Sequence, residues 1–204
     1  MGIYREHVLP RLVNSMCAMP TGDPHRARVC AGLAGDVVEL GFGSGLNVPF
    51  YPATVRAVAA VEPSDLAWKL ARERVATSPV KVRRSGLDGQ ALELEDDSFD
   101  CALSTWTMCT IPDLEAALSE VRRVLRPGGT LHFVEHGLAP DESVVRWQHR
   151  LEPLQKRVFG GCHITRRIVE LVEGAGFTIR EVDRFYAEGS PQAMHAYTLG
   201  VAAV

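Results

Sequence analysis

The stretch VVELGFGSGLN at residues 37–47 passes from an apolar segment straight into a glycine-rich turn. A short apolar run that ends in glycine is typical of a buried parallel strand. Glycines at 41, 43 and 45 permit positive φ angles and let a ligand approach the backbone without interference from a Cβ. Because open α/β sheets bind ligands at the carboxyl ends of their strands, the stretch predicts a ligand site after a first strand. Position 46 is Leu, so the dinucleotide fingerprint GxGxxG is not met, and a tight strand-to-helix turn without a ligand is the alternative.

Strands and helices alternate around this turn. Apolar runs predict strands at 35–40, 55–62, 80–84, 99–104 and 130–135, and apolar spacing predicts helices at 64–77 and 113–125. Two further strands, at 177–184 and 194–201, are separated only by a loop, which favours one antiparallel strand near the C-terminus. The predicted fold is therefore α/β, a Rossmann-like doubly wound sheet of about seven mostly parallel strands with helices on both faces.

Composition limits the class of protein. The chain has 204 residues, 46% of them hydrophobic and 23% charged, with a formal net charge of −3. This length and balance predict one globular domain, and the lack of a basic excess argues against a general nucleic-acid binder. We divide the single domain, 1–204, into an N-terminal helical lid segment, a cofactor-binding core, a helical acceptor-side segment and a terminal strand pair, at 1–33, 34–140, 141–176 and 177–204.

Membrane, secretion and metal signals are weak. Apolar stretches such as 55–61 are far shorter than the ~20 residues that span a bilayer, and the first ten residues lack a signal peptide's apolar region. The five cysteines form no CxxC pair, and the histidines form no HxxxH or HExxH pair. We therefore expect no disulfide framework, no metal and a reducing, cytoplasmic location.

Two carboxylates follow the second and third strands. Glu62 stands about twenty residues after the glycine turn, where a carboxylate can accept both hydroxyls of an adenosine ribose. Asp88, in the segment LDGQAL, is placed to accept from an adenine amino group. A solvent-facing loop glutamate is the alternative interpretation of Glu62.

These segments together resemble the class I S-adenosylmethionine-dependent methyltransferases. ELGFGSG is similar to the family's first motif, VEPS to the second, and LDGQAL with DDSFD to the adenine segment. EVRRVLRPGG at 120–129 is similar to the family's post-helix motif, whose Pro-Gly-Gly turn separates the helix from the fifth strand. The resemblance implies S-adenosylmethionine as cofactor, with Glu39 near its methionine end, Glu62 on the ribose and Asp88 with Gly89 at the adenine. The cofactor contacts expected in full are Glu39, Gly41, Gly43, Gly45, Asn47, Glu62, Pro63, Asp88, Gly89 and Thr105.

A narrower resemblance concerns the acceptor. GSGLNVPFYP at 43–52, STWTMCTIPD at 104–113, VEHG at 134–137, RWQHRLEP at 146–153 and GGCHITR at 160–166 are similar to segments of the thiol S-methyltransferases, a subgroup with a methyltransferase type 11 domain. The mammalian members are membrane-anchored, and their N-terminal hydrophobic anchor is not expected in this chain. The resemblance implies a small-molecule acceptor, a thiol favoured, methylated by direct in-line displacement, with no nucleic acid and no integral membrane segment.

Two residues are candidates for catalysis. A thiolate is only a few per cent populated near pH 7 for a thiol pKa of about 8.5, so a base or cation beside the acceptor helps. His136 is expected to accept the thiol proton or stabilise the thiolate, or else to order the strand end by hydrogen bonds. Arg166 supplies positive charge to an anionic acceptor, or else is solvated at the start of a helix.

The acceptor pocket is expected to draw on several parts of the chain. Trp106 suits a sulfonium cation, because an aromatic face attracts positive charge. Cys109 and Cys162 are read chiefly as small apolar side chains, since direct displacement needs no covalent enzyme intermediate. Trp147 lies on a stripe with Leu151 and Leu154 that is either core or pocket wall. The substrate-side residues expected in full are Tyr4, Trp106, Cys109, Trp147, Cys162 and His163, with a helix at 4–17 packing over the cleft through Val8, Leu12 and Cys17.

Other functions stay open at this stage. Within the class, the acceptor is alternatively a small amine, phenol or quinone-type molecule. Outside it, a nicotinamide-dependent oxidoreductase is disfavoured by the missing third glycine and by the absence of a Tyr-xxx-Lys pair. A non-catalytic protein that binds S-adenosylmethionine is the third possibility.

Overall fold

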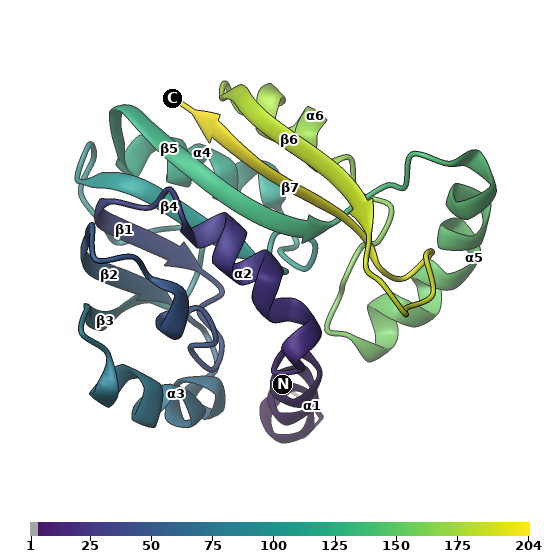
Figure 1. Ribbon diagram of the computed structural model, residues 1–204, viewed down its shortest axis with the longest axis horizontal. Helices are drawn as coiled ribbons and strands as arrows, with labels where there is room; N and C mark the ends of the chain where they lie inside the picture. The colour runs from purple at the N-terminus through teal and green to yellow at the C-terminus, as the bar shows by residue number, and fades with distance from the viewer. Residues whose placement is uncertain (1–3) are drawn as a thin grey trace.

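The computed structural model describes residues 4–204, in which seven strands form one sheet in the order β3-β2-β1-β4-β5-β7-β6 (Figure 1). The strands are β1 (Gly35–Leu40), β2 (Val55–Val61), β3 (Lys81–Gly86), β4 (Phe99–Thr105), β5 (Leu125–His136), β6 (Thr178–Tyr186) and β7 (Ala196–Ala203). β1 to β5 pair in parallel, and β7 runs antiparallel to both β5 and β6. The predicted fold class, including the single antiparallel strand, is confirmed.

Helices cover both faces of this sheet. In Figure 1, α2 lies in front of the sheet and α4 and α6 behind it, while α1 lies below the strands. The helical elements are η1 (Tyr4–Val8), α1 (Leu9–Cys17), η2 (Pro20–Gly22), α2 (Asp23–Cys30), η3 (Val48–Phe50), α3 (Asp65–Thr77), α4 (Leu114–Val124), α5 (Glu142–Val158) and α6 (Ile168–Gly174). No helix in the described part of the chain is both long and apolar enough to cross a bilayer. The first three residues of the expected lid segment, 1–33, lie outside the described residues.

Local signals in the sequence place the helix starts. The side chain of Ser64 accepts a hydrogen bond from the Ala67 amide at 3.2 Å, and that of Asp113 accepts one from the Ala116 amide at 3.0 Å. Each satisfies an amide that the first helical turn leaves without a partner. α3 and α4 therefore begin within one residue of the predicted positions.

The core has one layer on each side of the sheet. One layer packs α4 and α6 against the strands through residues such as Leu118, Val121 and Ile168. The other packs α2, η3 and α3 against the opposite face through residues such as Val29, Val48 and Ala71. Burial on both faces explains why the central strands are continuous apolar runs, and it fixes the positions of their carboxyl ends.

β5 is longer than predicted. It begins at Leu125, directly after α4, because Leu125 pairs with Phe99 of β4 ahead of the main run of pairs from Thr130 onward. The Pro127-Gly128-Gly129 turn signal therefore falls inside the strand, at a register shift, and does not separate helix from strand.

The apolar stripe predicted on α5 is wrong for Trp147 and Leu154, whereas Leu151 packs against the buried cluster that includes Cys162. Trp147 and Leu154 are 56% and 62% exposed, and the guanidinium of Arg150 lies 5.1 Å from the Trp147 ring centre. The buried face instead carries Gln148, whose amide donates to the carbonyls of Gly137 and Ile164 and accepts from the Ala139 amide. A buried amide is favourable there because it satisfies backbone groups that have no partner in the sheet.

Candidate active site

A cavity of about 710 Å³ opens at the carboxyl ends of the parallel strands. Its walls come from the loops that follow β1, β2, β3 and β4, from the last residue of β5, and from α1, α2 and the end of α5. This is the edge at which open α/β sheets bind ligands, as the sequence predicts. On α1 the lining side chains include Leu9, Val13 and Cys17, whereas Val8 and Leu12 of the predicted face do not line the cavity.

The glycine turn forms one end of the cavity. The amides of Gly41 and Phe42 both donate to the Val61 carbonyl, at 2.9 and 3.2 Å, so the turn is tied to the end of β2. Gly41 has φ +63° and Gly43 φ +58°. A Cβ on Gly41 would collide with the side chain of Thr107, whereas a Cβ on Gly43 would meet only the Gly41 carbonyl oxygen, at 3.8 Å. The turn is thus packed on one side and open on the other.

Glu62 lies against this turn with its carboxylate fixed. Its Oε2 accepts from the Gly43 amide and its Oε1 from the Ser64 amide, both at 2.7 Å, and the residue is buried but lines the cavity. Burial raises the pKa of Glu62, against the lowering effect of the two amides. Each oxygen keeps a lone pair for a ligand hydroxyl.

Asp88, Gly89 and Pro63 also line the cavity. The Asp88 Oδ1 accepts from the Gln90 amide at 2.9 Å and from the Gln90 side chain at 3.0 Å. These hydrogen bonds lower the pKa of Asp88, so the group is an acceptor. The structure therefore brings together the two carboxylates that the sequence places after separate strands.

A buried polar network lies behind the glycine turn. Arg26 donates to the Asn47 Oδ1 at 2.7 Å, and the Asn47 Nδ2 donates to Glu39 and to the Thr105 hydroxyl, both at 2.9 Å. The Tyr51 hydroxyl donates to the second oxygen of Glu39. Asn47 and Thr105 line the cavity, whereas Glu39, predicted as a cofactor contact, is buried beside Asn47 and is not among the lining residues. Glu39 instead orients Asn47.

Glu39 makes the stability of the chain depend on pH. Burial raises the pKa of Glu39 to about 7, well above the ordinary glutamate value of about 4.3. Between these values the folded chain holds a proton that the unfolded chain has released, so the free energy of unfolding falls as pH rises, by up to about 1.4 kcal/mol per pH unit. The stabilisation is complete below the unfolded pKa and lost as pH rises through the folded one. Glu39→Gln is expected to flatten this slope.

Urea unfolding at pH values from about 5 to about 7 checks the expectation. Burial also raises the pKa of Glu62 and Glu135, but these groups act equally in both proteins and cancel in the comparison. Glu93→Gln, at an exposed position, is the matched control and should keep the wild-type slope. Parallel curves for wild type and Glu39→Gln would contradict the assignment.

Trp106 forms a wall of the cavity directly after β4. It has φ +50°, and the guanidinium of Arg26 lies 4.7 Å from its ring centre. The Tyr197 ring packs against it in an edge-on arrangement, with the ring centres 5.7 Å apart. This placement agrees with the predicted aromatic wall.

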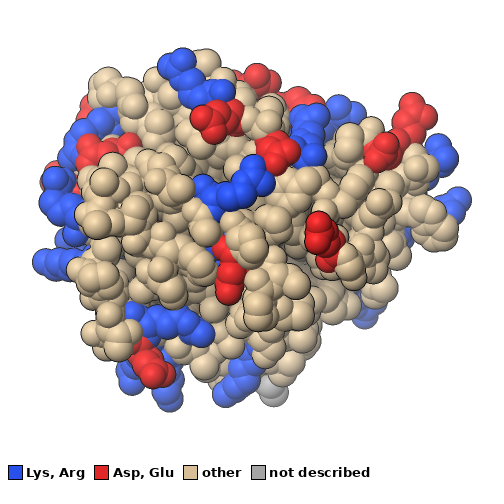
Figure 2. Space-filling view, viewed as in Figure 1, with Lys and Arg blue, Asp and Glu red and all other residues tan. Residues whose placement is uncertain are grey.

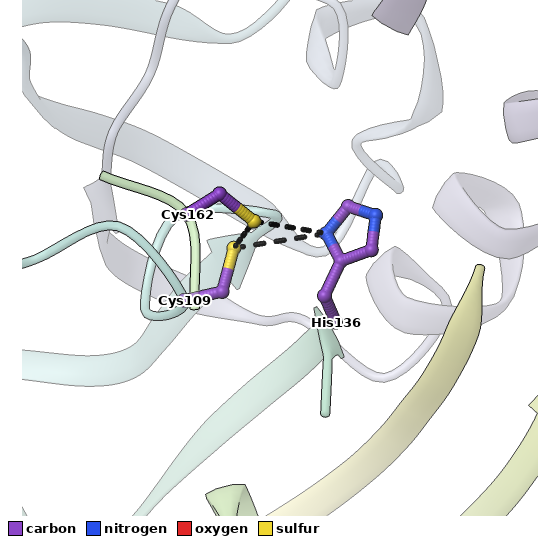
Figure 3. Close-up of side chains that lie close together, drawn as sticks. All are labelled: Cys109, His136 and Cys162. Atoms are coloured by element: carbon purple, nitrogen blue, oxygen red, sulfur yellow. Dashed lines mark hydrogen bonds between the residues drawn. The ribbon is translucent and has the colours of Figure 1, made fainter. Parts of the chain in front are cut away.

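Cys109, His136 and Cys162 meet at the same cavity (Figure 3). The His136 Nδ1 lies 3.7 Å from the Cys109 Sγ and 3.9 Å from the Cys162 Sγ, and the two sulfurs are 3.5 Å apart. The contact with Cys109 and the imidazole lower the pKa of Cys162, whereas the same sulfur contact and burial raise the pKa of Cys109. Two cysteines expected to be apolar filling thus face a histidine.

Arg166 and His163 do not line the cavity. Arg166 donates to the carbonyls of Met108 and, at 2.6 Å, Ile111, so its charge holds the loop after β4. The His163 amide donates to the Cys109 carbonyl at 2.8 Å, and its ring lies 3.3 Å from Glu152. Both residues, which the sequence predicts to contact an acceptor, are engaged with other parts of the protein in this structure and position the loop.

Three other predicted site residues also lie off the cavity wall. Trp147 is exposed on α5. The Tyr4 hydroxyl donates to the Val158 carbonyl at 2.6 Å, on the surface. A Cβ on Gly45 would lie 3.2 Å from the Phe42 ring, so this glycine serves packing. Sequence reasoning missed Arg26, Tyr51 and Tyr197 as site residues; the FYP segment, with Tyr51, and the HAY segment at 195–197, with Tyr197, carried local signals.

Comparisons with known proteins agree with this geometry. The family model described as a methyltransferase domain matches residues 38–133, from β1 into β5. Human thiol S-methyltransferase TMT1A is 31% identical over 173 residues, which are 81% of this chain and 69% of that protein. Rat thiol S-methyltransferase TMT1B is 34% identical over 146 residues, which are 70% of this chain and 59% of that protein. The chain thus spans less than two thirds of the rat relative.

One solved structure is similar over nearly the whole chain. It is a Thermotoga maritima protein described as a SAM-dependent methyltransferase and possible histamine N-methyltransferase. It superposes with a TM-score of 0.70 at 25% identity and covers 97% of this chain and 98% of its own.

Proposed function

Because this chain belongs to the methyltransferase family that includes human thiol S-methyltransferase TMT1A, we propose that it transfers a methyl group from S-adenosylmethionine to the sulfur of a small thiol. The observation that carries the proposal is that one cavity holds both candidate binding regions. It has the glycine turn and Glu62 at one part of its wall and the half-buried His136 with two cysteines at another. The methyl donor and the acceptor can therefore bind in the same cavity.

The residues on the wall fit the proposed cofactor. S-adenosylmethionine supplies an electrophilic methyl group on a cationic sulfur when it is bound. Glu62 would hold the ribose hydroxyls, because both its oxygens are fixed by amides and each retains a lone pair. Asp88 would accept from the adenine amino group, and Gly43 leaves open space where a side chain would stand.

The protein's contribution to the chemistry is positioning and control of the acceptor proton. Holding two reactants in line can supply several kcal/mol of the barrier. The Trp106 face favours a neighbouring cation, and the apolar side chains of α1 exclude water from the cavity. His136 stabilises the thiolate, the reactive form of the acceptor.

The proposed function includes a cytoplasmic location and a small-molecule acceptor. All five cysteines are free thiols, including a pair of sulfurs 3.5 Å apart, and this supports a reducing cytoplasm. Figure 2 shows acidic and basic side chains interspersed over one face of the molecule, which supports a small-molecule acceptor over a nucleic acid.

Glu62→Ala is expected to weaken binding of S-adenosylhomocysteine, the product form of the cofactor, by roughly 1–3 kcal/mol, about fivefold to more than a hundredfold. The loss comes from the missing charge-assisted hydrogen bonds and from the freed Gly43 amide. Isothermal titration calorimetry measures it. Glu73→Ala, which removes the same charge from the exposed face of α3, should bind normally. Unchanged affinity in Glu62→Ala would remove this residue from the site.

An acceptor competition tests the reaction itself. The protein and S-adenosylmethionine are mixed with small thiols, phenols and amines, and the methylated products are identified by mass spectrometry. A thiol ether as the main product supports the proposal. Methylation of only a phenol or amine overturns the thiol assignment. Stabilisation by NADH but not by S-adenosylhomocysteine, measured as a rise in Tm, would overturn the donor.

A further inference from the structure

The sulfur and nitrogen atoms of Cys109, His136 and Cys162 are the strongest feature of the cavity that methyl transfer alone leaves unexplained. All three potential ligand atoms lie within 4.8 Å of one another. Their separations are 3.5 Å between the sulfurs and 3.7 and 3.9 Å from the sulfurs to the imidazole Nδ1. Figure 3 shows the two cysteines and the histidine pointing toward one common space.

These separations match those around a tetrahedral metal. Zinc binds cysteine sulfur at about 2.3 Å and histidine nitrogen at about 2.0–2.1 Å, which at tetrahedral angles places two sulfurs ~3.8 Å apart and sulfur and nitrogen ~3.6 Å apart. The observed distances differ from these by about 0.3 Å or less. Two thiolates and a neutral imidazole also balance the charge of a divalent ion.

The backbone around the ligands is held in place. Glu135, fully buried, accepts from the amides of Cys109 and Thr107 at 3.2 and 3.0 Å, and this fixes the loop after β4. The His163 amide donates to the Cys109 carbonyl at 2.8 Å and so joins the loop that carries Cys162 to the loop that carries Cys109. His136 is the last residue of β5. Such fixed ligands lose little freedom when a metal binds.

We propose that Cys109, His136 and Cys162 bind zinc, with the fourth coordination position on the side of the cavity. Two cysteines and one histidine with an open position are a ligand set of catalytic zinc sites, whereas structural zinc sites have four protein ligands. Because all three residues line the cavity, the fourth position is available to a small molecule inside it.

The use of this position rests on the proposed function. A thiol that coordinates zinc loses its proton, here to solvent, and remains as a thiolate. Its sulfur lone pair then forms the new bond to the methyl carbon as the carbon–sulfur bond of the sulfonium donor breaks, and the donor leaves as a neutral thioether. The zinc site would thereby supply the thiolate that the reaction requires.

Metal titration in the absence of donor and acceptor tests the site. The full chain is reduced with a phosphine, stripped with a chelator and titrated with Co²⁺ as a spectroscopic substitute for zinc. The expected result is one Co²⁺ per chain, a thiolate-to-cobalt charge-transfer band and the strong visible bands of tetrahedral cobalt. Zinc should then displace the cobalt. A reduced and folded chain that gives no charge-transfer band would overturn the proposal.

Variants connect the signal to the three residues. Cys109→Ser, Cys162→Ser and His136→Asn are each expected to lower metal affinity by more than about 100-fold, beyond the roughly 10–100-fold loss typical of supporting residues. Cys101→Ser is the matched control, because this buried cysteine contacts Thr130 instead of the cluster and should leave the titration unchanged. Circular dichroism verifies that each variant is folded. A cobalt spectrum that persists in both cluster serine variants would also overturn the site.

The two proposals fail in different ways. Equal rates of thiol methylation by the stripped and the zinc-loaded chain would overturn the role of the metal and leave the methyltransferase intact. One bound zinc without methylation of any thiol would support the site and overturn the proposed reaction.

Discussion

Replacement of Arg26 by methionine is expected to lower the free energy of unfolding by about 3 kcal/mol, because it removes one partner of a buried ionic network. The guanidinium is 3% exposed and donates to Asn47 at 2.7 Å and to the Cys17 carbonyl at 3.1 Å. Methionine fills similar volume but leaves both acceptors without a donor. The loss stays at the lower end of the usual range for such changes, because Glu39 can take up a proton when the cation is gone.

Arg28→Met is the control, since it removes the same charge two residues further along α2. Arg28 pairs with Asp183 at 2.8 Å, but both side chains are about half exposed, and surface pairs of this kind contribute about 0–1 kcal/mol. Urea unfolding near neutral pH measures both variants. Similar small losses in the two proteins would mean that the Arg26 network does not stabilise the fold.

The donor side of the site could be predicted because each of its residues follows directly from a strand. The glycine turn comes after β1, Glu62 after β2 and Thr105 at the end of β4. In a parallel sheet the carboxyl ends of neighbouring strands meet at one edge, so sequence order is enough to place these residues together. The strand order that predicts the fold class therefore also predicts the residues on the cofactor side of the site.

Arg26 and Arg166 could not be assigned from sequence for a different reason. Both are charged residues that look solvated in any local pattern, yet each is drawn inward by distant oxygen atoms. Arg26 meets Asn47 across 21 positions, and Arg166 meets the Ile111 carbonyl across 55 positions. Local periodicity contains no information on such partners. The burial of Gln148 on α5 could not be predicted for the same reason, because its hydropathy favours a position on the surface.

The sequence did not predict that Cys109, His136 and Cys162 form a cluster, because each residue comes from a separate segment. Metal motifs in sequence rely on two ligands close together along the chain, but here single residues follow β4, end β5 and follow α5. Only the parallel pairing of β4 with β5 and the turn after α5 bring positions 109, 136 and 162 to one point.

Gly41→Ala is expected chiefly to lower the stability of the fold, and Gly43→Ala chiefly to lower the affinity for the cofactor. The two glycines nevertheless lie two residues apart and have similar φ values of +63° and +58°. The positive φ alone costs each alanine roughly 1–2 kcal/mol. At Gly41 the new methyl group also collides with Thr107, whose amide is bound by Glu135 and whose side chain cannot simply move away. Overpacking adds about 1–3 kcal/mol, so Gly41→Ala should lose about 2–5 kcal/mol of unfolding free energy.

At Gly43 the methyl group meets only the Gly41 carbonyl oxygen, at 3.8 Å, so the stability loss should stay near the cost of φ. Because Gly43 lines the cavity beside Glu62, the methyl group instead occupies space that the cofactor needs, and the affinity for S-adenosylhomocysteine should fall about tenfold to a hundredfold. Urea unfolding and calorimetry on both variants separate the two effects. The double variant Gly41→Ala/Thr107→Gly relieves the collision and should lose less than the sum of its single changes. Equal stability losses at positions 41 and 43 would show that Thr107 does not set the requirement for glycine in this turn.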